Sequence, residues 1–158
     1  MAFFYFMNVE GAMSSYRFCD SREIDAEQVL GLYRIADWAK DRTLEETEAI
    51  LAQSSLVVSL WEEDRLVAFA RVLTDFVVRA AIFDVIVYPD DQGKGLGRLL
   101  MEKLLAHPAL EKVPAFFLMT KDKQAFYTKF GFVRTAERQV DAMLLIREKA
   151  RIPSGSNR

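Results

Sequence analysis

The chain has 158 residues, of which 51% are hydrophobic and 28% charged, and its formal net charge is −2. This length predicts one domain with a substantial core, and the slightly acidic balance argues against a nucleic-acid-binding protein, which would carry a clustered basic face. The single cysteine, Cys19, excludes a disulfide within the chain, and the single histidine, His107, argues against a zinc site or a Ser-His-Asp triad.

The two ends of the chain differ from its middle. Residues 1–7 are apolar and aromatic, but they are too few and lack the basic flank of a signal peptide or a membrane span. We expect residues 1–15 to form an N-terminal extension or an extra edge strand, and residues 151–158 to form a flexible tail. Residues 16–150 are then a single domain of a cytoplasmic protein that contacts no membrane.

Hydrophobic periodicity and capping signals predict the elements in chain order. Asp25 with Gln28, and Thr43 with Glu46, have the spacing of capping boxes, and each pair is followed by an apolar helical face. The expected helices cover residues 25–38, 43–52, 95–106 and 123–130. The expected strands cover residues 16–19, 56–61, 66–74, 80–88, 115–120, 132–135 and 142–146.

This order predicts an α/β (α+β) fold with a mixed, mostly antiparallel sheet of about six to seven strands and about four helices. The connection from residues 80–88 through a helix to residues 115–120 is expected to be a right-handed crossover, so these two strands should run parallel.

Three glycines at alternate positions, Gly93, Gly95 and Gly97, lie between an apolar strand that ends at Pro89 and an amphipathic helix. Glycines let backbone N–H groups approach a ligand closely, and the helix N-terminus behind them carries a partial positive charge. This pattern indicates a seat for a phosphate or diphosphate. A dinucleotide fingerprint is excluded because Arg98 stands where its third glycine would be, and a P-loop is excluded because no Gly-Lys-Ser/Thr follows.

The run Gln92-x-x-Gly95-x-Gly97 after a strand closely resembles the acyl-CoA loop of the GNAT N-acetyltransferase superfamily. A second stretch, residues 125–132 (Ala-Phe-Tyr-Thr-Lys-Phe-Gly-Phe), resembles the C-terminal signature of that superfamily, a helix with a tyrosine followed by Gly-Phe. The resemblance covers roughly residues 16–147 and is greatest to small-molecule amine acetyltransferases of bacteria and plastids.

The resemblance implies acetyl-CoA as co-substrate and no metal. It also implies that the two parallel strands diverge, so that backbone groups freed from strand pairing bind the pantetheine arm, while the glycine loop binds the diphosphate. Lys94 and Arg98 either add charge toward phosphate or are solvated side chains. The residues implied at the cofactor are Val85, Ile86, Val87, Gln92, Gly93, Lys94, Gly95, Leu96, Gly97, Arg98 and Thr120; at Thr120 many relatives carry asparagine.

The resemblance places Tyr127 as the acid that protonates the departing thiolate; the alternative is a core aromatic. The amine must also lose a proton. Positions 81 and 83, where many relatives carry an acidic residue or a histidine, are apolar here. Asp84 is either a base with a raised pKa or a partner of Arg71. Asp75 and an ordered-water relay are the other candidates for the base.

The expected acceptor is a primary amine of a small molecule, including the arylalkyl type, with protein N-termini and lysines as alternatives. Acidic side chains at positions 62, 75 and 84 are suited to a cationic amine. Four aromatic residues either form an acceptor wall or pack in the core: Tyr33, Trp38, Phe76 and Phe117. A CoA-binding sensor or subunit without turnover, and a plain nucleotide-binding protein, are further alternatives, and a homodimer through the aromatic N-terminus or the last strands is compatible with the sequence.

Overall fold

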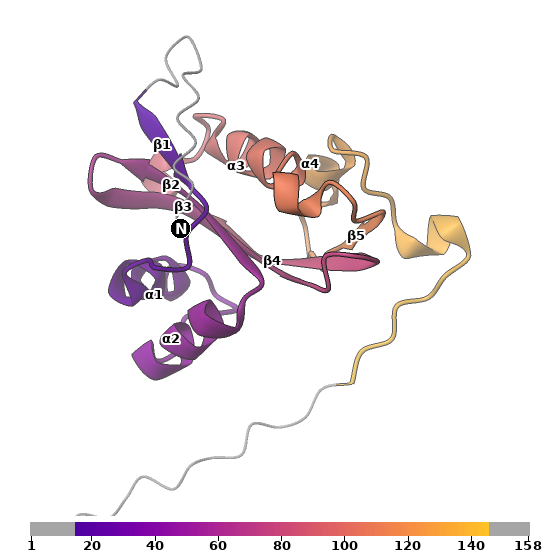
Figure 1. The fold of residues 1–158 in the computed structure, drawn as a ribbon, viewed down its shortest axis with the longest axis horizontal. Coiled ribbons are helices and arrows are strands. Elements are labelled where there is room, and N and C mark those ends of the chain that lie inside the picture. The colour runs from indigo at the N-terminus through magenta and orange to yellow at the C-terminus, as the bar shows by residue number, and fades with distance from the viewer. Residues whose placement is uncertain (1–14, 146–158) are drawn as a thin grey trace, which may run out of the picture. The chain divides into compact units, whose positions relative to one another are not determined.

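The computed structural model describes residues 15–145, which form two compact units divided after Asp122 (Figure 1). The first unit contains five strands and three α-helices in its described part: β1 (Tyr16–Cys19), α1 (Ala26–Arg34), α2 (Leu44–Gln53), β2 (Leu56–Glu62), β3 (Arg65–Thr74), β4 (Arg79–Val87), α3 (Leu96–Leu105) and β5 (Ala115–Phe117). The described part of the second unit contains α4 (Gln124–Thr128). The predicted single domain over residues 16–150 stays a prediction, and residues 1–14 and 151–158 lie outside the described residues.

The caps of α1 and α2 follow the sequence signals closely. Thr43 and Glu46 form the expected reciprocal capping box, with N···O distances of 3.0 and 3.1 Å. Asp25 caps α1 by accepting from the amide of Glu27. The second half of the expected Asp25 box is wrong, because the Gln28 side chain instead accepts from the amide of Leu66 at 2.8 Å and so ties α1 to β3.

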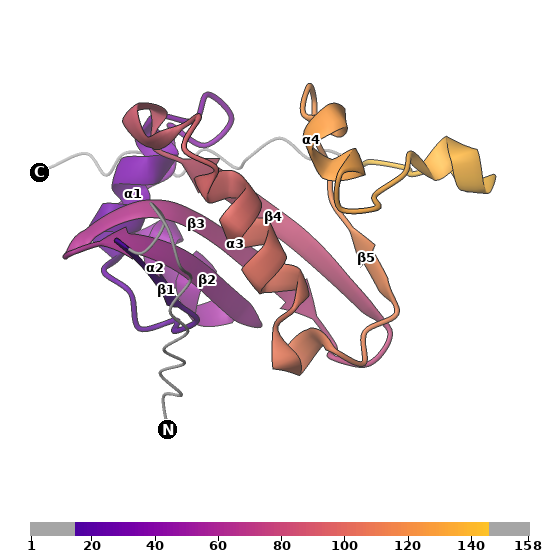
Figure 2. The same cartoon turned by 90° about the horizontal axis from the view of Figure 1, so that it is seen from above.

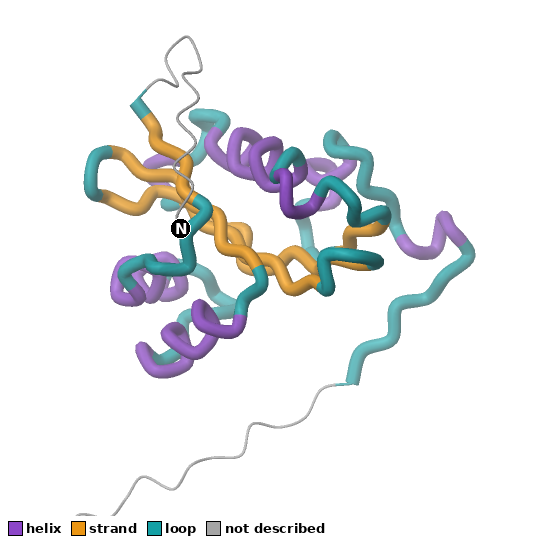
Figure 3. The backbone as a smooth tube through the Cα atoms, viewed as in Figure 1, coloured by secondary structure: helices purple, strands orange, loops and turns teal. Residues whose placement is uncertain are grey.

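The five strands form one sheet in the order β1-β2-β3-β4-β5 (Figure 3). The first four pair antiparallel, and β4 and β5 pair parallel, as the predicted crossover requires. Helices α1 and α2 lie on one side of the sheet and α3 crosses the other (Figure 2). The apolar faces of α1 and β3 meet in a buried cluster that includes Val29, Leu32, Tyr33 and Phe69.

The parallel pair β4–β5 is short. Only Arg79–Ala81 pairs with Ala115–Phe117, and β5 ends there rather than at the predicted residue 120. Strand β4 continues to Val87, so its last six residues have no strand partner on the β5 side within residues 15–145. The expected divergence of the two parallel strands is therefore present.

The predicted strand pair 132–135 and 142–146 is wrong for the described residues. Thr135–Arg138 forms a 3₁₀ turn, and residues 142–145 have no regular structure, while Ile146 lies outside the described residues. The apolar side chains of this segment, such as Met143 and Leu145, are largely exposed. A β-branched or aromatic pattern stabilises a strand only through cross-strand pairs, and the described segment has none, so the sheet has five strands.

Candidate active site

Strand β4 carries a β-bulge at Asp84. Arg71 of β3 is opposite Phe83 of β4, and Phe69 is opposite Ile86. Two residues of β4, 84 and 85, therefore lie opposite the single residue 70 of β3. Asp84 has φ +55, in the left-handed region that aspartate tolerates better than most residues. Side-chain direction alternates along a strand. One extra residue in β4 therefore changes which face of the sheet each later side chain of β4 points to.

The Asp84 carboxylate is held by three side chains from three parts of the first unit. Its Oδ2 accepts from the Tyr33 hydroxyl at 2.8 Å, from Arg42 Nη1 at 2.9 Å and from Arg71 Nε at 2.6 Å. Its side chain is 4% exposed. Arg42 also stacks over the rings of Tyr33 and Trp38, and Arg71 lies over the Phe83 ring. We call these four residues, Tyr33, Arg42, Arg71 and Asp84, the Asp84 cluster.

The cluster decides between the two readings of Asp84. Burial pushes the pKa of Asp84 up, but the hydrogen bonds and positive charges of Arg42 and Arg71 outweigh it and hold that pKa below its ordinary value. Asp84 thus pairs with Arg71, as one of its two interpretations predicts, and its pKa is lowered, whereas its interpretation as a base would need a raised pKa. Burial and the neighbouring Asp84 raise the pKa of the Tyr33 hydroxyl, so that group stays protonated and donates.

Asp75, the other carboxylate considered as a base, is an exposed turn residue between β3 and β4. Its Oδ1 accepts from the amides of Val77 and Val78 at 2.8 Å each, and these bonds lower its pKa. Neither aspartate thus has the raised pKa of a general base at neutral pH.

The open edge of β4 leads straight into the glycine loop. The Tyr88 amide donates to the Val67 carbonyl of β3, whereas the Val87 carbonyl accepts from Gln92 Nε2 at 3.2 Å on the loop side. Peptide groups alternate between the two sides of a strand. Val87 therefore turns its backbone N–H and C=O to the open edge, and Ile86 turns its own to Phe69. The C=O of Val85 shares a peptide with the Ile86 N–H and so faces the open edge.

The loop itself is built from backbone. Gly93 and Gly95 have φ +77 and +81, and Gly95 occupies the N-cap of α3 with no side-chain cap. Within residues 15–145, the amides of Gly93, Lys94 and Gly95 donate to no other residue of the protein. The first amides of α3, at Leu96 and Gly97, have no intrahelical acceptor either. The Leu96 side chain is buried, so only its backbone is available to a ligand.

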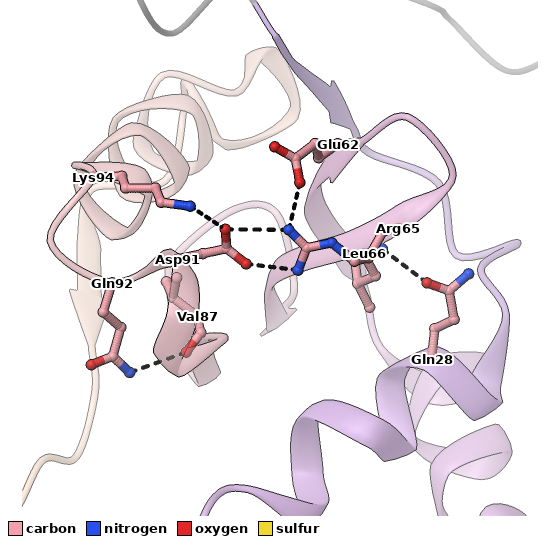
Figure 4. A network of polar contacts seen from close by, with 8 residues as sticks. All are labelled: Gln28, Glu62, Arg65, Leu66, Val87, Asp91, Gln92 and Lys94. Carbon is pink, nitrogen blue, oxygen red and sulfur yellow. Dashed lines mark hydrogen bonds and ion pairs between the residues drawn. The ribbon is translucent and has the colours of Figure 1, made fainter.

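The side chain of Asp91 connects this loop to the neighbouring strand β3 (Figure 4). Its buried carboxylate accepts from Arg65 Nη1 at 2.7 Å and from Lys94 Nζ at 2.8 Å, and Glu62 pairs with the same Arg65. The Arg65 bond is the main reason that the pKa of Asp91 is lowered. Sequence reasoning missed Asp91 and Arg65; an aspartate just before the glycines was the available signal.

The remaining predicted site residues have ordinary partners or environments. Lys94 pairs with Asp91, and Arg98 pairs with Glu102 one helical turn on. Thr120 follows β5 and is half-buried. Of the aromatic residues considered as an acceptor wall, Tyr33 is in the core, while the side chains of Trp38, Phe76 and Phe117 are between 40% and 59% exposed.

Tyr127 lies on α4, in the second unit. Its ring packs edge-on against Phe126 and Phe132, with centroids 5.0 and 6.0 Å away, and burial raises the pKa of its hydroxyl. A phenol in this environment stays protonated at neutral pH, as an acid must.

Between residues 15 and 145 there is no group of three or more histidine, cysteine, aspartate or glutamate side chains placed to hold a metal ion. Over the same residues, each helix is too short or too polar to cross a bilayer.

Comparisons with known proteins agree on one family. The model of the acetyltransferase (GNAT) domain matches residues 22–146. The uncharacterized N-acetyltransferase ycf52 of Porphyra purpurea is 32% identical over 120 residues, 73% of this chain and 68% of that protein. Serotonin N-acetyltransferase 2, chloroplastic, of Oryza sativa is 33% identical over 117 residues, 73% of this chain and 56% of that protein. The chain spans 58% and 55% of the ycf52 proteins of Pyropia yezoensis and Gracilaria tenuistipitata.

Solved structures agree with this result. A Xanthomonas campestris protein assigned to the GNAT family has a TM-score of 0.72 at 28% identity, over 82% of this chain and 93% of that one. A GNAT family protein of Streptococcus pneumoniae, 24% identical, shares the fold with a TM-score of 0.72 over 85% of this chain and 99% of that one. With a divergent parallel strand pair, a glycine loop at the start of α3 and a family match over most of its length, this chain belongs to the GNAT family and is an acetyltransferase.

Proposed function

We propose that this chain transfers the acetyl group of acetyl-CoA directly to a primary amine of a small molecule in a ternary complex. One observation carries the proposal: within residues 15–145, β4 beyond Ala81 has no strand partner on the β5 side, and it leads into a loop before α3 whose amides at positions 93–95 donate to no other residue. An extended pantetheine arm supplies the hydrogen-bonding partners that a missing strand would supply, and a diphosphate matches the amides and the helix dipole.

The residues present fit this co-substrate. Val85 and the N–H of Val87 are available along the edge, the Val87 carbonyl being bonded to Gln92 Nε2. Residues 93–97 offer amides to the diphosphate without a side chain in the way at the glycines, whereas the Gln92 amide donates to the Pro89 carbonyl. Lys94 and Arg98 have carboxylate partners of their own, so backbone rather than side-chain charge provides most of the proposed grip. Thr120 is proposed as a further contact, by resemblance alone.

The chemistry is divided among few groups. Acetyl-CoA supplies an activated thioester. A backbone N–H on the open edge of β4 stabilises the developing oxyanion, and the Tyr127 hydroxyl donates its proton to the departing thiolate. The lowered pKa values of Asp84 and Asp75 leave an ordered-water relay as the route for the proton of the amine.

The acceptor is proposed from similarity to known acetyltransferases, not from the charge of acidic side chains in this chain. The acidic side chains considered for a cationic amine are all engaged: Asp84 by two arginines, Glu62 by Arg65 and Asp75 by turn amides. The similarity to a rice serotonin N-acetyltransferase supports an arylalkylamine. A soybean protein named histone acetyltransferase TAP1, 30% identical over 136 residues, supports a protein lysine as the second candidate.

A thiol-release assay tests both candidates. The protein is incubated with acetyl-CoA and with arylalkylamines, aliphatic diamines, amino acids, a histone-tail peptide or a peptide with a free N-terminus. Release with a small amine above the rate of acetyl-CoA hydrolysis supports the proposal, and release with a peptide alone favours the second candidate. If titration calorimetry detects acetyl-CoA binding but no acceptor leads to thiol release, the proposed catalytic activity is wrong and the chain is a CoA-binding module.

A further inference from the structure

The Asp84 cluster lies directly behind the strand segment that the proposed function uses. Asp84 is the residue before Val85, and its three partners come from α1, from the segment after α1 and from β3. A buried carboxylate with two guanidinium groups and a hydroxyl is costly to assemble, because each group must leave water. Such a cluster is retained where it specifies a geometry that apolar packing would not.

The geometry that it specifies is the bulge. Arg71 contacts two consecutive residues of β4, the Phe83 ring by stacking and the Asp84 carboxylate through Nε. In a regular strand these two side chains would point to opposite faces. Only the left-handed conformation of Asp84 and the extra residue in β4 let one guanidinium reach both.

The bulge in turn decides which peptide groups face the open edge. Beyond it, Ile86 is opposite Phe69 and the Tyr88 amide bonds Val67, which leaves Val85 and Val87 facing outward. A strand without the extra residue would reverse this alternation and turn Ile86 outward instead. The side chain of Ile86 is buried in the core cluster that α1 and β3 share, and this burial opposes slippage between the two registers.

We infer that Asp84 is a positioning residue: held by Arg71, Arg42 and Tyr33, it fixes the bulge that directs the peptide groups of Val85 and Val87 at the thioester end of acetyl-CoA. This inference rests on the proposed function. Asp84 then touches neither substrate, and it neither takes nor gives a proton. Its contribution to the rate comes from placing backbone dipoles, for which errors near 1 Å cost up to about 100-fold.

Asp84→Asn is the informative variant. Asparagine tolerates the left-handed conformation as aspartate does, so the change removes charge without adding backbone strain. We expect kcat to fall about 10- to 100-fold, with a smaller loss of acetyl-CoA affinity because the glycine loop is intact. The pH dependence of kcat should keep its shape and midpoint. If Asp84 were the general base, the acidic limb of the kcat profile would instead be lost in Asp84→Asn.

A milder variant covers the case in which Asp84→Asn fails to fold. Tyr33→Phe removes one hydrogen bond and no charge, and should lower kcat by a few-fold with an unchanged pH midpoint. Arg17→Met, on β1, is the matched control: it removes an exposed arginine that stacks over the Trp61 ring, outside the cluster and outside the proposed site. Wild-type kcat in both cluster variants, or a shifted pH midpoint in either, would overturn the inference.

A spectroscopic readout separates this inference from the function on which it rests. In the ¹⁵N-labelled protein, addition of acetyl-CoA should shift the amide signals of Val85 and Val87 more than that of Ile86, and the difference should shrink in the cluster variants. If these shifts appear but no amine releases thiol, the proposed reaction fails and the positioning of the backbone stands. If Ile86 shifts most, the positioning fails whatever the activity.

Discussion

The carboxylate of Asp91 lies 2.7 Å from Nη1 of Arg65, and this ion pair joins the loop before α3 to the first residue of β3. Asp91 is 1% exposed, while the Arg65 side chain is about half exposed. The pair therefore fixes the base of the glycine loop from inside the protein, and it leaves the amides of the loop free to face outward.

Asp91→Asn should destabilise the fold. Because the folded-state pKa of Asp91 is below its unfolded value of about 4, its ion pairs stabilise the fold at pH values above 4 and are lost as the pH falls through the folded-state value. We expect the free energy of unfolding to drop by about 1–3 kcal/mol at pH 7. Denaturant titrations at several pH values measure it, and the difference from wild type should shrink below pH 4. The exposed neighbour Asp90→Asn should change little; an equal loss there would contradict the anchoring role.

Gly97→Ala separates binding from folding in the loop. Gly97 lies in the first turn of α3, where alanine is favoured over glycine by about 1 kcal/mol, so stability should hold or rise. The added methyl group should hinder the close approach of the diphosphate and weaken acetyl-CoA binding about tenfold or more in titration calorimetry. Gly93→Ala is the converse control. No atom lies within 4 Å of its new Cβ, so this change acts on the stability of the loop through the strained positive φ rather than through a steric contact. An unchanged Kd in Gly97→Ala would remove the backbone cradle from the proposal.

Tyr127→Phe tests the proposed acid. The loss of its hydroxyl should lower kcat by about 10²- to 10⁴-fold while acetyl-CoA affinity stays near that of wild type. Because burial raises the pKa of Tyr127, the midpoint of any basic limb that this group gives the wild-type profile of kcat should lie above the ordinary tyrosine pKa of about 10. Single-turnover measurements with a reactive amine check both points. Unimpaired turnover in the variant would leave Tyr127 as a packing residue between Phe126 and Phe132.

Gly31→Ala tests how α1 meets the end of β4. A Cβ at position 31 would lie 2.7 Å from the Tyr88 hydroxyl oxygen, closer than van der Waals contact allows. Although alanine favours the helix, we expect a net loss of about 1–3 kcal/mol from this overpacking. In the double variant with Tyr88→Phe the oxygen is gone, and stability should recover to the wild-type value or above it. If the double variant is as unstable as Gly31→Ala, contacts of α1 other than Tyr88 require glycine at position 31.

Much of the fold is encoded locally. The capping box at Thr43, the strand-loop-helix around Gly93 and Gly95, and the parallel crossover from β4 to β5 all form as the sequence indicates. The capping box and the strand-loop-helix depend on residues close in the chain, whose backbone preferences act over one or two turns. The crossover joins strands far apart in the chain, such as Arg79 and Ala115, and its parallel direction follows from the handedness rule. The strand pair expected after Phe132 joins two neighbouring segments, and local preference alone did not predict its absence from the described residues.

The amino-acid sequence by itself determined the glycine loop between a core strand and a helix, which we propose as an anion site, because glycine conformation and helix dipoles are local properties. Only the tertiary structure decided the role of each charged side chain. It placed Asp84 between Arg42 and Arg71 and Asp91 between Arg65 and Lys94, across separations of 13 to 42 residues for Asp84 and up to 26 for Asp91. Ionisation depends on which charges fold to within a few ångströms, and that distance is a property of packing.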